Sequence, residues 1–393
     1  MTDPWLTLIG IGEDGLPGLS QAARAALDRA DVVFGAPRHL ALAGAGPRGR
    51  QWPVPFAVDP VLALRGERVV VLASGDPFWH GAGGSLVPHL ASGEWTSHPA
   101  PSTFQIAANR LGWRLEDTIC LGLHAAPFAR LRPVLSGETR AICLLRDATA
   151  PAALAAWLVQ YGFGATAMTV LEALGGPSER IRTATAQTFC LPDIAAPVAV
   201  ALHTAPGTGL PRGAGLPDDA FAHDGQITRA PIRAITLSAL APRPGAHLWD
   251  IGAGSGSVSV EFMLAGGRAT AIEARADRVA NIRHNAETFG LEHRLQLVEG
   301  RAPAALHGLT PPDVVFIGGG CDEALLRVLW DTAPPGTRMV VNSVTLDTEA
   351  LLIHWHGTHG GTLWRFDVAE VRPLGRLRGW EPARPVVQWR VTR

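Results

Sequence analysis

A glycine-rich turn follows an apolar run at residues 248–257, which read LWDIGAGSGS. A glycine turn at the carboxyl end of a parallel strand lets the backbone approach a ligand closely, and it opens the crevice where open α/β sheets bind small molecules. A different turn of the same general kind, TLIGIGEDG, stands at residues 7–15. Two unlike turns so far apart predict two unlike α/β domains in one chain.

Length and composition agree with two folded domains. The chain has 393 residues, of which 47% are hydrophobic and 18% charged, and single hydrophobic cores stop growing at roughly 250–300 residues. The formal net charge of −1 provides no general field for nucleic acid or for an anionic membrane. Lysine is absent and arginine supplies the basic side chains, so a lysine Schiff base and a phosphate-loop lysine are excluded. An anionic substrate would meet arginine, which binds carboxylates through two parallel hydrogen bonds.

The four cysteines indicate neither a disulfide framework nor a metal site. Cys120, Cys143, Cys190 and Cys321 are isolated and show no paired metal-ligand spacing, so we expect a reducing cytosol and no bound metal. No apolar run reaches membrane-spanning length, and no signal core follows a basic region near residue 1. We therefore expect a cytoplasmic protein without a membrane partner.

Alternation of apolar runs with Ala/Leu/Arg-rich stretches predicts how the chain is divided. Residues 1–203 alternate strand-like runs such as 5–11 with helical stretches such as 19–30, which argues for α/β units on a largely parallel sheet. Residues 204–225 are rich in Pro, Gly and Asp, and we expect a linker there. From 226 to 393 the alternation resumes and predicts a second α/β domain.

The second domain carries the features of a nucleoside-binding crevice. Gly252, Gly254 and Gly256 follow a strand that ends at Asp250, and Glu273 ends the next strand, 23 residues past Asp250. An ionised carboxylate at that place can accept hydrogen bonds from both hydroxyls of an adenosine ribose. This fingerprint alone leaves NAD and S-adenosylmethionine both open.

Acidic residues around the turn favour one of these two cofactors. Glu261 lies one turn into the helix that follows Asp250, and a dinucleotide would need its pyrophosphate at the N-terminus of that helix. The acidic setting is better suited to a cationic aminoacyl sulfonium. The domain resembles the seven-strand methyltransferase fold, which binds S-adenosylmethionine.

Flanking segments make this resemblance closer. Residues 216–229 (LPDDAFAHDGQITR), 233–234, 248–258, 316–320 (FIGGG) and 341–346 (VNSVTL) are similar to the decarboxylating C15-methyltransferases of cobalamin biosynthesis. The bare glycine turn argues against adenine N-methylation, because amino-methylating enzymes usually carry Asn/Asp-Pro-Pro-aromatic there. Arg229 stands where the family typically has lysine, so the charge is kept.

The resemblance also implies roles for individual residues of the second domain. The glycine turn after Asp250, together with Glu273, would hold the cofactor, with Arg301 and Ala302 near its adenine. The candidates for the tetrapyrrole side of the site are Thr228, Arg229, Arg233, Asn342 and Thr345. Surface ion pairs remain an alternative role for Arg229 and Arg233.

The first domain resembles the tetrapyrrole methylase family, in which S-adenosylmethionine binds in a cleft between two α/β lobes. The resemblance rests on residues 7–15, 70–77 (VVLASGDP), 99–105 (PAPSTFQ), 121–124 (LGLH) and 168–181 (MTVLEALGGPSERI). Each segment alone also fits an ordinary turn or helix cap; in this order they are most similar to the C5-methylating branch. The residues implied to line the cofactor cleft are Gly10, Gly12, Gly75, Asp76, Ser102 and Thr103. His124 is a candidate for proton transfer, with a structural histidine as the alternative.

Both resemblances together cover nearly the whole chain and follow the order of a bifunctional family of cobalamin biosynthesis. We therefore expect a two-lobed tetrapyrrole methylase fold followed by a Rossmann-like methyltransferase fold. The family implies two methyl transfers from S-adenosylmethionine, one cofactor per domain, to C5 and C15 of a precorrin. It also implies loss of carbon dioxide from the acetate side chain at C12.

The expected partners are a tetrapyrrole substrate and further copies of the chain, since relatives of both halves commonly form homo-oligomers, and no nucleic acid. Three alternatives stay open. An RNA methyltransferase fusion would use the same two folds but needs a basic stripe. An NAD-linked oxidoreductase would share the second glycine turn, and a scaffold protein would have one catalytically inactive domain.

Overall fold

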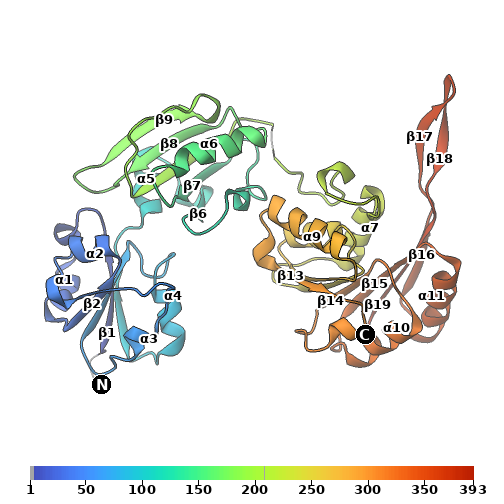
Figure 1. Ribbon diagram of the computed structural model, residues 1–393, viewed down its shortest axis with the longest axis horizontal. Coiled ribbons are helices and arrows are strands. Elements are labelled where there is room, and N and C mark those ends of the chain that lie inside the picture. Colours follow the sequence, from blue (N-terminus) through green and yellow to red (C-terminus); the bar gives the residue numbers. More distant parts are fainter. Residues whose placement is uncertain (1–3, 208) are drawn as a thin grey trace. The chain divides into compact units, whose positions relative to one another are not determined.

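The computed structural model describes residues 4–207 and 209–393, which form two compact units. Of the described residues, the first unit comprises 4–128 and 134–207, and the second comprises 129–133 and 209–393. Both units are α/β structures, as the sequence predicts (Figure 1). Within the described ranges, no helix is both long and apolar enough to cross a membrane.

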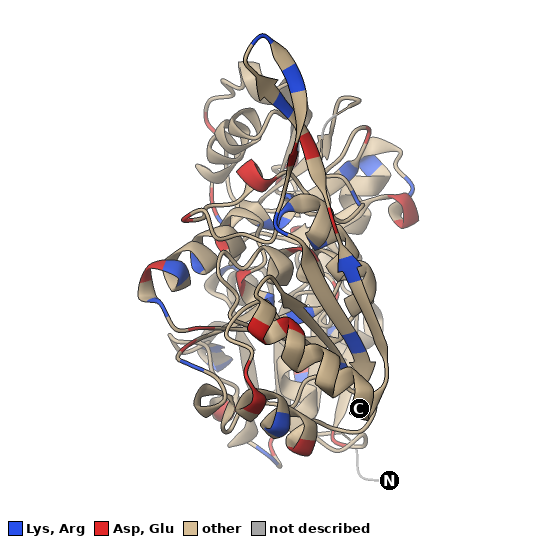
Figure 2. Ribbon diagram, turned by 90° about the vertical axis from the view of Figure 1, so that its right-hand side faces the viewer, with Lys and Arg blue, Asp and Glu red and all other residues tan. Residues whose placement is uncertain are grey.

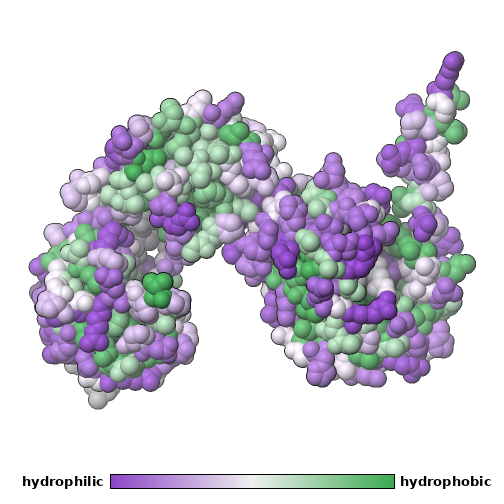
Figure 3. Space-filling view, viewed as in Figure 1, coloured by the Kyte–Doolittle hydropathy of each residue, from purple (hydrophilic) through white to green (hydrophobic). Residues whose placement is uncertain are grey.

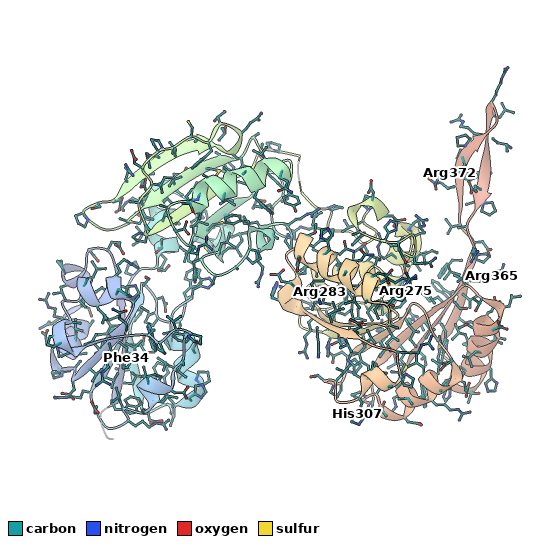
Figure 4. The ribbon with its side chains drawn as sticks, viewed as in Figure 1. Phe34, Arg275, Arg283, His307, Arg365 and Arg372 are labelled. Atoms are coloured by element: carbon teal, nitrogen blue, oxygen red, sulfur yellow. The ribbon has the colours of Figure 1, made fainter. Side chains whose placement is uncertain are left out.

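The first lobe of the first unit is a five-stranded parallel sheet in the order β3-β2-β4-β1-β5. Apolar clusters cover both faces of this sheet; Phe34, labelled in Figure 4, belongs to one of them. Strands covered on both faces are near-continuous hydrophobic runs, and the run before Ser74 is of this kind. The elements are β1 (Leu6–Ile11), α1 (Gln21–Arg29), β2 (Val32–Gly35), α2 (Pro37–Leu42), β3 (Gly49–Gln51), α3 (Asp59–Leu62), β4 (Val69–Ser74), α4 (Gly83–Leu86) and β5 (Trp95–His98).

The second lobe differs from the largely parallel sheet that the sequence predicts. Its strand order is β6-β7-β10-β8-β9; the neighbours β6 and β7 pair in parallel, and the other neighbouring strands pair antiparallel. The short polar segment after Glu172 joins β8 directly to β9, and such a connection can only produce an antiparallel pair. The elements are α5 (Thr103–Leu111), β6 (Ile119–Gly122), β7 (Arg140–Leu144), α6 (Ala150–Gln160), β8 (Ala167–Glu172), β9 (Arg180–Thr185) and β10 (Val198–His203).

Buried charge pairing explains the Leu-Glu-x-Leu-Gly-Gly-x-x-Glu-Arg-Ile segment of this lobe. The Glu172 carboxylate, whose side chain is 1% exposed, accepts hydrogen bonds from Arg180 Nη2 at 2.6 Å and Arg182 Nη2 at 2.9 Å. The second acid of the segment, Glu179, pairs with Arg110 of α5 at 2.7 Å. These residues therefore hold β8, β9 and α5 together.

The second unit contains a seven-stranded sheet in the order β13-β12-β11-β14-β15-β19-β16. Helices α7 and α8 pack on one face of this sheet, and α10 and α11 pack on the other. The order reverses between β11 and β14, and doubly wound sheets bind ligands at the carboxyl ends of strands beside such a reversal. The elements are α7 (Ala230–Leu240), β11 (His247–Ile251), α8 (Ser257–Leu264), β12 (Arg268–Glu273), α9 (Ala276–Thr288), β13 (Leu295–Glu299), β14 (Val314–Ile317), α10 (Glu323–Thr332), β15 (Arg338–Ser343), α11 (Leu346–His359), β16 (Thr362–Phe366) and β19 (Val386–Thr392).

Part of the predicted linker belongs to the second unit. Leu216 and Phe221 are 2% and 5% exposed and lie in its apolar core. The backbone N–H groups of Gly215 and Leu216 donate to the Glu261 carboxylate at 2.6 and 3.0 Å. Residues 215–221 are therefore held on the second unit, although the segment is rich in the residue types that usually indicate a loop.

A two-stranded antiparallel hairpin, β17 (Ala369–Leu374) and β18 (Leu377–Pro382), forms a sheet of its own. It extends away from the seven-stranded sheet (Figure 1), and almost all of its residues are exposed. The apolar residues Val371, Leu374, Leu377 and Trp380 are 45%, 70%, 76% and 74% exposed. Figure 3 shows apolar and polar residues together on this hairpin.

Candidate functional site

The first glycine turn lies against the end of the neighbouring strand in the first unit. Gly10 of β1 pairs with Ala73 of β4, and a Cβ at Gly10 would overlap the carbonyl oxygen of Gly75. The backbone N–H of Ala100 also donates to that oxygen at 3.1 Å. Glycine is therefore required at residue 10 by the close approach of the two turns.

A cavity of about 780 Å³ lies between the two lobes of the first unit. Five of the residues predicted for this site line it: Gly12, Gly75, Ser102, Thr103 and His124. The structure thus brings residues from the first glycine turn, the β4 turn, the start of α5 and the β6 end to one cavity. Most of the remaining lining is apolar, which suits a large organic ligand.

Two of the predicted cofactor residues also have local structural partners. Ser102 Oγ accepts from the N–H of Gln105, and Gln105 Oε1 accepts from the N–H of Ser102, which is a capping box at the start of α5. The Asp76 carboxylate accepts from the N–H of Phe78 at 2.8 Å. A carboxylate and a hydroxyl each retain further hydrogen-bonding capacity, so these contacts leave room for a ligand.

Sequence reasoning missed a polar cluster in the same cavity. Arg38 forms an ion pair with Glu13 and donates to Ser74 Oγ at 2.9 Å, while His39 Nε2 lies 2.8 Å from that hydroxyl. Burial and then the Arg38 charge lower the pKa of His39 to about 4, so this imidazole is neutral at pH 7. Arg38 and His39 closely follow Gly35 at the carboxyl end of a strand, and this position was the signal that could have identified the cluster.

A second histidine in the cavity was also missed. His80 lines the cavity beside His124, with ring centroids 6.1 Å apart. It lies shortly after the Gly75-Asp76-Pro77 turn, and nothing in its spacing to His124 indicates that the fold brings the two together.

The glycine turn of the second unit contacts the bare glycine turn after β14. Gly252 has φ of 68°, and a Cβ there would lie 2.6 Å from the carbonyl oxygen of Gly319. The N–H of Gly318 donates to the carbonyl oxygen of Ile251 at 3.0 Å. Gly254 and Gly256 continue this turn into α8, and both also have positive φ.

Glu273 is 5% exposed and lies at this turn. Its carboxylate accepts from the N–H of Gly254 at 2.9 Å and from the N–H of Arg275, at the start of α9 (Figure 4), at 3.0 Å. Each carboxylate oxygen keeps a free lone pair, so hydroxyl groups of a ribose can still donate to it. The predicted spacing from Asp250 has thus placed an acceptor beside the glycine turn.

Asp250 is fully buried at the end of β11. One carboxylate oxygen accepts from the N–H and Oγ of Ser259 at 3.2 and 2.6 Å, and the other has no hydrogen-bond partner among the described residues. Burial raises the pKa of Asp250 to about 6, the Ser259 hydrogen bonds oppose the rise, and the Glu273 charge adds to it. A buried acceptor without a partner beside the glycine turn fits a cationic ligand such as an aminoacyl sulfonium.

The prediction that Glu261 makes the surroundings of the glycine turn acidic was wrong. This carboxylate is neutralised by Arg233, whose Nε donates to it at 2.6 Å, and it does not add free negative charge to the turn. Arg233 is 0% exposed and also donates to Asp218 and to the carbonyl oxygens of Leu216 and Thr228. Arg233 has no exposed surface in this structure, and its hydrogen bonds fix the segment before α7 onto α8.

The other candidates for the tetrapyrrole side differ in availability. Arg229 is 63% exposed and pairs with Asp218 at 3.3 Å, and Thr345 is exposed at the N-terminus of α11, where its hydroxyl accepts from Thr348. Asn342 donates to Thr236 and accepts from Gln388, both at 2.9 Å, so its amide is satisfied inside the unit. Thr228 is half-buried before α7.

Arg301 and Ala302 follow β13. Arg301 is exposed, and Ala302 is half-buried against the apolar cluster under α10 and α11. In the described parts of the chain, no group of three or more His, Cys, Asp or Glu side chains is placed to hold a metal ion.

Family models match each unit separately. Residues 6–190 match the model of tetrapyrrole (corrin/porphyrin) methylases, and residues 219–393 match that of a precorrin methyltransferase domain. The crystal structure of the C-terminal domain of precorrin-6Y C5,15-methyltransferase from Rhodobacter capsulatus is 57% identical, with a TM-score of 0.46. It covers 47% of this chain and 100% of that one.

Curated relatives extend over the whole chain. A precorrin-6Y C(5,15)-methyltransferase [decarboxylating] from a Sinorhizobium species is 45% identical over 100% of this chain and 97% of the relative. The protein with the same name from Mycobacterium tuberculosis is 40% identical over 99% of this chain and 100% of the relative. The chain therefore belongs to the family of decarboxylating precorrin-6Y C5,15-methyltransferases.

Proposed function

We propose that this chain methylates a precorrin at C5 and C15 and removes the carboxyl group of its C12 acetate. The first unit carries out the C5 transfer, and the second carries out the C15 transfer and the decarboxylation. The observation that carries this division is the pair of glycine contacts, Gly10 with Gly75 and Gly252 with Gly319, each at the carboxyl edge of a sheet. Each unit thus has a glycine turn of its own at a sheet edge, which supports one bound S-adenosylmethionine per unit.

S-adenosylmethionine supplies an already activated methyl group on a sulfonium, so the protein needs no nucleophile of its own. In the second unit Glu273 would hold the ribose of the cofactor, and the negative charge of Asp250 would favour its positive aminoacyl end. Fixing the acceptor carbon, the methyl carbon and the sulfur in line can supply several kcal/mol of the barrier, on the order of the 7–11 kcal/mol known for well-oriented reactions. Decarboxylation uses the macrocycle as the electron sink, and exclusion of water from the crevice favours loss of the charged carboxylate.

The edge of the sheet beside the second glycine turn suits a flat, apolar macrocycle. No side chain projects from the turn at 318–320, and Val344 and Leu346 after β15 are 56% and 82% exposed. Arg229 immediately precedes α7, and its exposed side chain can bind a carboxylate of the substrate. These features support a precorrin acceptor.

RNA is not proposed as a substrate. The full-length relatives carry the precorrin name, and the net charge is −1. Blue basic residues and red acidic residues are both scattered along the ribbon in Figure 2. We also propose a cytoplasmic location, which the four unpaired cysteines support.

Two matched variants test the division of labour. Glu273→Ala removes the ribose acceptor of the second unit, and Asp76→Ala alters the β4 turn of the first. Each full-length variant is incubated with precorrin-6B and S-adenosylmethionine, and the tetrapyrrole product is measured by mass spectrometry. The first variant should lose the C15 methylation alone, and the second should lose the C5 methylation alone. If each variant lost both steps while remaining folded, the two units would not act independently.

A further inference from the structure

His80 and His124 are the titratable groups of the first-unit cavity that have no charged partner and no hydrogen bond within the described residues. The other titratable side chains on the cavity wall are engaged: Glu13 pairs with Arg38, and His39 contacts Arg38 and Ser74. Asp76, four residues before His80, accepts from a backbone N–H. The two histidines are therefore available to a ligand.

The backbone places both imidazoles in the same part of the cavity. His80 has φ of 58°, a left-handed conformation that a residue with a side chain adopts at a cost. A Cβ at Gly122 would lie 3.0 Å from Cε1 of His80 and 3.1 Å from Cε1 of His124. The absence of a side chain at Gly122 makes room for the two rings, and strained backbone at a cavity wall is typical of functional sites.

The surroundings of His80 favour a neutral imidazole. Its ring lies 5.9 Å from the ring of Phe104 and 6.1 Å from that of His124. Burial lowers the pKa of His80, and the charge of His124 lowers it further. A neutral imidazole near pH 7 can accept a proton, which is the requirement for a general base.

We propose that His80 accepts the proton that C5 releases during methylation, and that His124 is a positioning residue that acts on its imidazole from the facing lobe of the cavity. This inference rests on the proposed function of the first unit. C5 uses a carbon electron pair to bond the methyl carbon, as the bond from that carbon to sulfur breaks and leaves its pair on sulfur. The C5–H bond then breaks, its electron pair returns to the macrocycle, and the proton passes to the imidazole of His80.

The first test follows the imidazoles directly, without turnover. Histidine-labelled full-length protein is titrated by NMR as the native chain and as the His124→Asn variant. The pKa of His80 should lie below the ordinary value of 6.5, and it should rise in the variant. The rise should be about half a pH unit, the size expected for two like charges ~6 Å apart in water-like surroundings. A pKa of His80 that does not respond to the loss of His124 would overturn the role given to His124.

The second test measures the reaction with precorrin-6B and S-adenosylmethionine in the full chain. His80→Asn is chosen because asparagine tolerates left-handed backbone, and exposed His89, outside the cavity, provides the control variant His89→Asn. C5 methylation should fall about 100-fold or more in His80→Asn, while C15 methylation, decarboxylation and cofactor binding by calorimetry persist. As the pH is lowered, the rate of C5 methylation should begin to fall at a higher pH in His124→Asn than in the native chain. The reason is that His80 becomes protonated at a higher pH in the variant.

The outcomes separate this inference from the function on which it rests. A native chain that methylates neither carbon would contradict the proposed function, and the inference with it. A native chain that methylates both carbons, with a His80→Asn variant that keeps C5 methylation within about twofold, would overturn the inference alone.

Discussion

Gly252 is required for two separate physical reasons. Its φ of 68° lies in the left-handed region, and a Cβ would lie 2.6 Å from the carbonyl oxygen of Gly319. Gly245 shares only the first feature, since its φ is 79° and no atom lies within 4 Å of the position of a Cβ. Comparing the two glycines isolates the contribution of the close approach.

We expect Gly252→Ala to abolish cofactor binding in the second unit, because the β11 and β14 turns must move apart. Gly245→Ala should cost about 1–2 kcal/mol of stability, the usual penalty of left-handed backbone, and should keep binding intact. Calorimetry with S-adenosylmethionine should give one site per chain for the first variant and two for the second. Two sites in Gly252→Ala would show that the close approach is not needed.

Asp250 gives a pH-dependent prediction. Burial raises its pKa from 3.8 to about 6, so the folded state holds the proton more tightly than the unfolded state. The contribution to stability is therefore complete below about pH 4 and is lost as the pH rises to about 6. A shift of ~2 pH units corresponds to about 3 kcal/mol.

Asp250→Asn removes this titration while keeping an acceptor for Ser259. We expect the variant and the native chain to be similar in stability at pH 4 and the variant to be more stable by about 2–3 kcal/mol at pH 7. Hydrogen-exchange protection of the β11 amides, corrected for intrinsic rates, measures this difference. If the stabilities of the two proteins changed in parallel with pH, the raised pKa of Asp250 would be contradicted.

Spacing predicted some residues of the candidate site better than others. Glu273 was placed from its position at a strand end, because strand ends of a parallel sheet meet at one edge. The buried network of Arg233 with Glu261 could not be predicted, since it depends on the packing of residues 216–218 between α7 and α8. His80 was missed because its contact with His124 also depends on tertiary packing, since the two residues come from different lobes.

Elements with continuous apolar runs were predicted closely. The run at 5–11 corresponds to β1, and the stretch at 19–30 corresponds to α1. Strand direction in the second lobe was not predictable from those runs, because a buried strand has the same composition in either direction. The hairpin of β17 and β18 was missed because its strands contain glycine, proline and charged residues.

The hairpin is the element that we expect to join copies of this chain. Val371 and Trp380 are cross-strand partners on the face that also carries Pro373 and Pro382, and an isolated two-stranded hairpin is only marginally stable in water. Both outer edges are unpaired in this sheet. The hairpin has both signs of charge, with Arg372 (Figure 4) 2.8 Å from Glu370. Open edges, an apolar face and mixed charge favour an identical hairpin as the partner.

The native chain should therefore form a homo-oligomer, and Trp380→Ser combined with Val371→Ser should convert it into a monomer. The matched control is Ile353→Ser, which changes a residue that is 53% exposed on α11. Light scattering after size-exclusion chromatography measures the mass of both variants and of the native chain. A native chain that is already monomeric, or an unchanged mass in the double variant, would contradict this role of the hairpin.

At the scale of the whole molecule, two units with separate cores each contain a glycine turn at a sheet edge. The order of the two domains was predictable, because each glycine turn is followed by its own alternation of strands and helices. The boundary was less predictable: residues 209–225 pack on the second unit through Leu216 and Phe221 despite their loop-like composition. Apolar side chains spaced among prolines and glycines do not reveal which core they join.

The most direct measurement is mass spectrometry of precorrin-6B incubated with S-adenosylmethionine and the native full-length chain. The product should gain two methyl groups and lose one carbon dioxide. A substrate of unchanged mass, with an intact precorrin and bound cofactor verified in the same sample, would contradict the assignment of this chain to corrinoid methylation.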